Sequence, residues 1–208
     1  MKRIDIILSL IIGEVSAWLI LAVKSNLELD FFFLRIQYLA ILLPILAFIG
    51  LYFTYFLSKI KAIFFQLGKF VLTGVLNTLI DFGILNFLIS LSGATEGGLY
   101  SMFKGLSFLV AVTNSYFWNK FWVFESKKYT SRAEYLQFIV VSAIGFGVNV
   151  GIASLVVNLI GPLGGASPKL WANVGAIGGT LVGLTWNFLG YKFIVFKAKE
   201  SGITNQES

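Results

Sequence analysis

Asn77 and Asp81 stand four residues apart inside a long apolar run. In an α-helix this spacing places both side chains on one face. A carboxylate inside a membrane segment is costly, so it usually faces a bundle interior or a water-filled cavity. Two interpretations of the pair stay open. The side chains could contact substrate hydroxyls or take up a proton, or they could form a structural hydrogen bond that fixes helix packing.

Further amides lie along the chain and only partly match this pair. Asn149 stands 68 positions after Asp81, which keeps the polarity and loses the charge. Asn114 and Asn119 precede one short basic motif, and Asn187 precedes another. Amides in membrane helices often bond across helices at about 1 kcal/mol, so a packing role is a strong alternative to substrate binding.

Two lysines open closely similar five-residue motifs. Lys120 begins KFWVF and Lys192 begins KFIVF. A lysine near a helix end can complement helix carbonyls or reach toward lipid headgroups, and this alone would explain both residues. Their matched positions beside aromatic side chains favour a second interpretation, in which a basic, aromatic rim holds the phosphate of a lipid-linked substrate.

Glu14 is a further candidate intramembrane acid. It lies near the middle of an N-terminal apolar run, outside the paired motifs. A direct role in function and a pairing with Lys104 or another helix residue are both open for this side chain.

Several chemistries are excluded by composition. The chain has no cysteine and no histidine, which removes thiol nucleophiles, imidazole catalysis and the usual zinc sites. It has no Walker-type glycine loop, no serine beside a base and no paired carboxylates on one face. We therefore expect neither an enzyme nor a resident cofactor or metal.

The elements that carry these residues are predicted to be membrane helices. Hydrophobic residues make up 57% of the 208 residues and charged residues only 12%, about half the charge of a soluble domain. Because the net charge of +6 comes from cations at the ends of apolar runs, it indicates topology and not nucleic-acid binding. Six segments are long enough to cross a bilayer; they are residues 4–23, 37–57, 68–91, 102–123, 135–160 and 169–195.

Turn residues and charges complete this prediction. We expect Gly93, Gly97 and Gly98 to break one connection, Gly161 to end the fifth segment, and Ser167-Pro168 to begin the sixth. The cations favour the two ends of the chain and the connections after segments two and four. This pattern predicts that both termini lie in the cytoplasm of a bacterial or archaeal cell.

The last four segments are predicted to form two parallel two-helix repeats. At an offset of 68, Phe70 matches Phe138 and Gly83 matches Gly151, and the offset grows to 72 at the closing motifs. Such a duplication is typical of pseudo-symmetric transporters with a site between the halves. Two-helix repeats often need a partner to enclose a path, so the pattern is also compatible with a homodimer.

The ordered motifs resemble the GtrA-like family of small membrane proteins. FVLTGVLNTLID (70–81) is similar to the family's first helix, and NSYFWNKFWVF (114–124) to the end of its second. QFIVVSAIGFGVNVGI (137–152) and NFLGYKFIVF (187–196) are similar to the remaining two. One departure is that Asn114 comes one place early, with Ser115 in the matching slot.

The resemblance covers residues 66–197. Residues 1–65 are expected to form a two-helix membrane extension that the family does not explain, and residues 198–208 to form a disordered cytoplasmic tail.

The resemblance implies a role in cell-surface polysaccharide or glycolipid synthesis. Family members are thought to move polyprenyl-phosphate-linked sugars across the cytoplasmic membrane, or to assist glycosyltransferases. In the first case Lys120 and Lys192 would attract the phosphate, while the intramembrane amides and Asp81 line a path for the sugar. In the second the protein is a membrane anchor or scaffold for a glycosyltransferase. A third alternative is a small-solute exporter that uses Glu14 or Asp81 for proton coupling.

Overall fold

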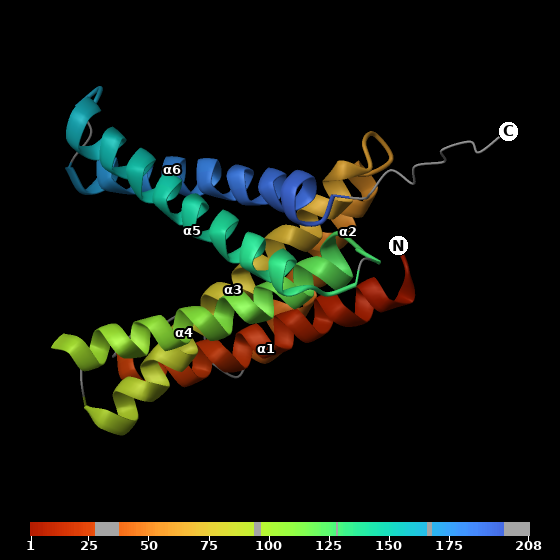
Figure 1. Ribbon diagram of the computed structural model, residues 1–208, viewed down its shortest axis with the longest axis horizontal. Helices are drawn as coiled ribbons and strands as arrows, with labels where there is room; N and C mark the ends of the chain where they lie inside the picture. Colours follow the sequence, from red (N-terminus) through yellow and green to blue (C-terminus); the bar gives the residue numbers. More distant parts are fainter. Residues whose placement is uncertain (28–37, 94–96, 128, 166–167, 198–208) are drawn as a thin grey trace, which may run out of the picture. The chain divides into compact units, whose positions relative to one another are not determined.

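The protein is helical throughout the residues that its computed structural model describes, which are 1–27, 38–93, 97–127, 129–165 and 168–197. Figure 1 shows the helices in chain order. Their bounds are α1 Arg3–Leu27, α2 Leu39–Leu57, α3 Ile63–Ser92, α4 Gly97–Trp118, α5 Arg132–Ser154 and α6 Pro168–Gly190. Short π-helical segments extend three of them: η2 Asn119–Val123 after α4, η3 Leu155–Ile160 after α5, and η4 Tyr191–Val195 after α6.

All six predicted helical segments are therefore confirmed as helices. Three of the described helices are also long and apolar enough to cross a membrane: Leu39–Leu57, Ile63–Ser92 and Arg132–Ile160. Large apolar side chains are exposed along every helix, among them Phe53, Phe87 and Phe146. Apolar residues on all faces are typical of helices that are solvated by lipid.

The start of α4 differs from the sequence-based expectation, whereas the neighbouring helix ends agree with it. Gly93 does end α3, with a left-handed φ of 71°. Gly97 and Gly98, which we expected to break the chain, instead lie in the first turn of α4. Glycine keeps its backbone N–H, so it can take part in helical hydrogen bonds, and its cost in a helix is mainly conformational entropy. Gly161 ends η3 with a φ of 70° and Pro168 begins α6, as predicted, whereas Ser167 lies outside the described residues.

The chain divides into two compact units, Met1–Glu125 and Ser126–Ser208. In the first unit, α3 packs against α1, α2 and α4. The N-terminal helices are thus integral to the unit that holds the first half of the family-like sequence. Glycine allows the closest of these contacts, since a Cβ at Gly13 of α1 would collide with backbone atoms of Leu43 and Pro44 in α2.

The second unit is a helical hairpin. Figure 1 shows α5 and α6 side by side, and the two helices pack along their length. Gly179 and Gly183 of α6 lie against Asn149 of α5, which lets the backbones approach closely. At the other end of the hairpin the rings of Phe138 and Tyr191 stack with their centroids 4.1 Å apart.

Candidate functional site

The candidate residues of the first unit form a polar seam between α3 and α4, which we define as Asn77, Asp81, Lys104, Ser107 and Asn114. The two α3 residues share a face, as their spacing predicted. Asn114 Nδ2 donates a hydrogen bond to Asn77 Oδ1 at 2.6 Å. One turn further along α3, Asp81 binds both Lys104 and Ser107. The seam thus joins the two helices through polar groups at two levels.

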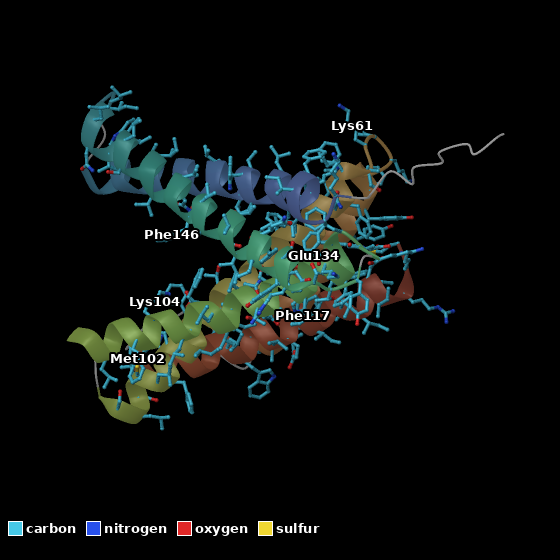
Figure 2. The ribbon with its side chains drawn as sticks, viewed as in Figure 1. Lys61, Met102, Lys104, Phe117, Glu134 and Phe146 are labelled. Atoms are coloured by element: carbon cyan, nitrogen blue, oxygen red, sulfur yellow. The ribbon has the colours of Figure 1, made fainter. Side chains whose placement is uncertain are left out.

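Asp81 uses both of its carboxylate oxygens in the seam. Ser107, whose side chain is fully buried, donates its hydroxyl to Oδ1 at 2.6 Å, and the Lys104 ammonium binds Oδ2. The Lys104 ammonium also lies 5.8 Å from the centroid of the Phe82 ring. Figure 2 labels Lys104 on α4. Lys104 therefore pairs with Asp81 and not with Glu14, the alternative that the sequence had left open.

Asn77 keeps an unused hydrogen-bond donor. Its Oδ1 accepts from Asn114, and within the described residues its buried Nδ2 has no hydrogen-bond partner. Asn114 is more fully engaged, because its Oδ1 also accepts from Trp118 Nε1 at 3.2 Å. A buried amide that lacks a partner carries a desolvation cost, and a ligand oxygen or a water molecule could offset it.

The closing motif of the first unit turns Asn119 and Lys120 inward. Both residues belong to η2, whose π-type bonding ends with Phe124 N–H donating to the Asn119 carbonyl at 2.9 Å. Asn119 Nδ2 donates to the Ser115 carbonyl at 2.8 Å. The Lys120 side chain has 0% exposure, and its ammonium lies 3.4 Å from the Tyr116 hydroxyl. Lys120 is thus buried. The interpretation in which it reaches toward lipid headgroups is not supported.

A second group of charges, which sequence reasoning missed, lies at the same end of the first unit. We call Asp5, Lys69, Trp122 and Glu125 the charged cluster. The Lys69 ammonium lies 2.8 Å from Asp5 Oδ1 and 3.1 Å from Glu125 Oε1, and it donates to the Trp122 carbonyl at 3.4 Å. Trp122 Nε1 donates to Asp5 Oδ1 at 3.0 Å. Asp5 and Lys69 are 1% and 3% exposed, so this ion pair is internal.

The charged cluster fixes the end of the closing motif to α1 and α3. The last carbonyls of a helix have no partner within the helix. Here Lys69 binds the carbonyl of Trp122, and Gln66 Nε2 donates to that of Val123 at 3.2 Å. Both capping side chains come from α3. The contact of Lys69 with a carboxylate 64 positions earlier has no local signal in the sequence.

Glu125 extends the charged cluster to the surface. It has a positive φ of 45°, an uncommon backbone conformation for a residue with a side chain. Its Oε2 lies 2.6 Å from the exposed Lys2 ammonium. The hydrogen bond from Lys2, assisted by one from Lys69, outweighs partial burial and lowers the pKa of Glu125. The same contact with Glu125 raises the pKa of Lys2.

The second unit holds the remaining candidates in different surroundings. Asn149 lies where α5 meets Gly179 and Gly183, and Asn187 lies against Gly145. Asn187 Oδ1 is buried without a hydrogen-bond partner among the described residues. Polar pairs therefore join α3 and α4, whereas glycines pack against the amides of α5 and α6.

The second closing motif has the same π-helical form as the first. Phe196 N–H donates to the Tyr191 carbonyl at 2.8 Å, which is equivalent to the bond from Phe124 N–H to the Asn119 carbonyl in the first motif. Lys192 lies 5.7 Å from the ring centroids of both Phe188 and Phe193. Its side chain is half-buried, which makes it more accessible than Lys120.

Glu14 has a local partner, because it accepts a hydrogen bond from Trp18 Nε1 at 2.8 Å. Nothing among its described contacts joins it to the polar seam. Within the described ranges no group of three acidic residues converges as metal ligands.

Comparison with known proteins identifies the family. Residues 69–196 match the model of the GtrA/DPMS transmembrane domain. The chain belongs to this family. The GtrA/DPMS domain begins at Lys69 of the charged cluster and ends at the last residue of the second closing motif. The resemblance stated from the sequence motifs is therefore confirmed.

A curated relative supports the same assignment. The chain is 30% identical over 150 residues to "Uncharacterized membrane protein YngA" of Bacillus subtilis (strain 168), which covers 72% of this chain and 89% of that protein. No solved structure matches the chain. Membership of the GtrA/DPMS family, together with the long apolar helices, shows that the chain is a membrane protein.

Proposed function

We propose that this protein translocates a polyprenyl-phosphate-linked sugar across the cytoplasmic membrane during the synthesis of cell-surface polysaccharide or glycolipid. The observation that carries the proposal is membership of the GtrA/DPMS family over residues 69–196, which supports a role in membrane-associated handling of glycolipid sugars. Family membership also fits a membrane protein that is not an enzyme.

In this proposal all six helices cross the membrane and both termini face the cytoplasm. The last four helices act as two parallel repeats, each ending in a closing motif on the cytoplasmic side. The common π-helical form of the two motifs supports this equivalence. The exposed apolar side chains provide a surface along which the prenyl chain stays in lipid.

Lys192 makes the first contact with the phosphate of the substrate. It is the more accessible of the two matched lysines, and it lies beside the rings of Phe188 and Phe193. Lys120 is fully buried in the first unit, so it attracts the phosphate through its charge and without direct contact. The amides of both units and Asp81 provide hydrogen-bonding groups for sugar hydroxyls, and the unpartnered atoms of Asn77 and Asn187 support this role.

Translocation is tested in proteoliposomes that contain a fluorescent polyprenyl-phosphate sugar. The fraction of lipid that becomes accessible to an impermeant reagent measures flipping. We expect the wild-type protein to exceed empty vesicles, and Lys192→Gln to flip about tenfold more slowly, because a charge-assisted contact is lost. Lys192→Arg keeps the charge and retains most of the rate. Lys127→Gln, which removes an exposed cation outside the helices, is the matched control and stays at the wild-type rate.

A second candidate function is a scaffold that holds a glycosyltransferase at the membrane. The observation that favours it is the internal pairing of Asp81 with Lys104 and Ser107, and of Asn77 with Asn114, as expected of groups that only fix packing. A scaffold would show no flipping above empty vesicles. It would bind a purified polyprenyl-phosphate glycosyltransferase with an affinity that conservative substitutions in the polar seam leave unchanged.

A further inference from the structure

The Lys104–Asp81 pair lies far from the closing motifs, along the same helices. Asp81 is 12 residues beyond Lys69 of the charged cluster, which corresponds to about 18 Å along α3. Lys104 is seven residues from the start of α4, or about 10 Å from that end. If α3 and α4 cross the bilayer, the pair lies within the hydrocarbon, in the half that is remote from the closing motifs.

Lys104 is the more exposed partner of the pair. Its side chain is 43% exposed, that of Asp81 is 21% exposed, and Ser107 is fully buried. An anion that approaches from outside the unit therefore meets the ammonium before the carboxylate. A pair that served packing alone would be expected to cover its charges, since charged groups in a membrane are costly.

Lys104 also has hydrogen-bonding capacity to spare. An ammonium has three N–H donors, and the described contacts of Lys104 use one of them, on Asp81 Oδ2. Asp81 in turn is held by Ser107, so the carboxylate keeps the lysine in place. The arrangement presents donors and positive charge at a fixed depth.

We propose that Lys104 is a second binding station for a lipid phosphate, in the membrane half remote from the closing motifs. Asp81 weakens anion binding at this station. Its negative charge lowers the affinity of Lys104 for an anion, so the phosphate can leave again, and a site on a transport path must permit release. The inference rests on the proposed function for the identity of the carrier lipid, and its test requires no translocation.

Binding is measured with the full chain in nanodiscs of zwitterionic lipid, with a fluorescent polyprenyl phosphate as the probe. We expect Lys104→Gln to weaken binding roughly tenfold and Lys104→Arg to retain it. Asp81→Asn should bind the probe severalfold more tightly, because it removes the competing charge and keeps the shape of the side chain. Lys127→Gln is the matched control and leaves the affinity unchanged.

Lys104→Gln and Asp81→Asn are expected to change the affinity for the probe in opposite directions. This difference distinguishes a binding station from a purely structural ion pair. If the pair only holds α3 to α4, both Lys104→Gln and Asp81→Asn lose stability and binding together, and that result overturns the proposal. Unchanged binding in Lys104→Gln overturns it as well. Thermal unfolding of each variant in the same nanodiscs shows which of them remain folded.

Competition identifies the source of the phosphate. Uncharged polyprenol should not displace the probe, and a polyprenol that displaces it as well as polyprenyl phosphate contradicts a phosphate station. Weak displacement by phosphatidylglycerol supports a station for the carrier lipid, and equal displacement supports one for phospholipid headgroups. Lys104-dependent binding without any flipping by the wild-type protein would sustain the station and reject the proposed translocation.

Discussion

Lys69 is an internal cation whose partners come from three separate parts of the first unit. It touches Asp5 of α1, the Trp122 carbonyl of η2 and Glu125 beyond it. Two charges removed from lipid and water are stable only when each keeps its partners. The closing motif KFWVF therefore depends on a residue near the N-terminus, which lies outside the matched family domain.

Lys69→Met should destabilise the first unit by about 3–5 kcal/mol, because it leaves the Asp5 carboxylate buried without its cation. The double variant Asp5→Leu/Lys69→Met should lose less stability than Lys69→Met alone, because it removes both members of the buried ion pair. Denaturant unfolding in detergent micelles measures the difference. Lys61→Met, at the exposed lysine labelled in Figure 2, is the control. If the double variant loses as much unfolding free energy as Asp5→Leu and Lys69→Met lose together, the two residues act independently.

The lowered pKa of Glu125 predicts acid sensitivity. Folding favours the ionised carboxylate, so its contribution to stability is full above the ordinary glutamate pKa of about 4.3. It is lost as the pH falls through the lower pKa of the folded protein. We expect the melting temperature of the wild type to fall between about pH 5 and pH 3, and Glu125→Gln to show a smaller fall. Lys2→Gln should reduce the fall as well, because Lys2 is the main cause of the lowered pKa.

Single residues show what the sequence could and could not predict. The shared face of Asn77 and Asp81 follows from helical spacing alone, and it is confirmed. The partner of Asp81 did not follow, although a lysine at position 104 inside an apolar segment was itself a signal. The burial of Lys120 and the Asp5–Lys69 contact depend on tertiary packing between distant segments, which no local pattern encodes.

At the scale of elements, Gly13 sets how closely α1 approaches α2. A Cβ there would collide with the backbone of Pro44, and backbone cannot move aside as a side chain can. Gly13→Ala should therefore cost about 1–3 kcal/mol of stability, as overpacked sites do. Gly50→Ala in α2 is the matched control, because nothing lies within 4 Å of its added Cβ. Equal unfolding midpoints for the two variants would contradict a close contact at Gly13.

The existence of all six helices could be predicted because long apolar runs are the strongest signal in a sequence. Their ends were less predictable. Gly97 and Gly98 have the composition of a turn, yet a first helical turn accepts glycine at little cost, so α4 begins earlier than expected. The π-helical segments have no simple compositional signature, and they appear only once the backbone hydrogen bonds are known.

At the scale of the whole molecule, the distribution of cations predicts its topology. Lys127 lies in the connection that follows the first closing motif, and Leu163 lies in the connection between α5 and α6; both are exposed. Because the chain has no cysteine, Lys127→Cys and Leu163→Cys each introduce a single thiol. We expect an impermeant maleimide to label Leu163→Cys in intact cells and Lys127→Cys only after permeabilisation. Labelling of both thiols, or of neither, in intact cells would reject parallel two-helix repeats.

The wide turns at the ends of α4 and α6 have a consequence for changes in chain length. A π-helical turn, closed by hydrogen bonds between residues five apart, holds more residues than the 3.6 in one turn of an α-helix. Removing one residue from KFWVF or KFIVF can be absorbed by tightening that turn into an ordinary α-turn. The widened turn cannot accommodate an added residue in this way, so an insertion shifts the residues that follow it. The two closing motifs should therefore accept a one-residue deletion more readily than a one-residue insertion.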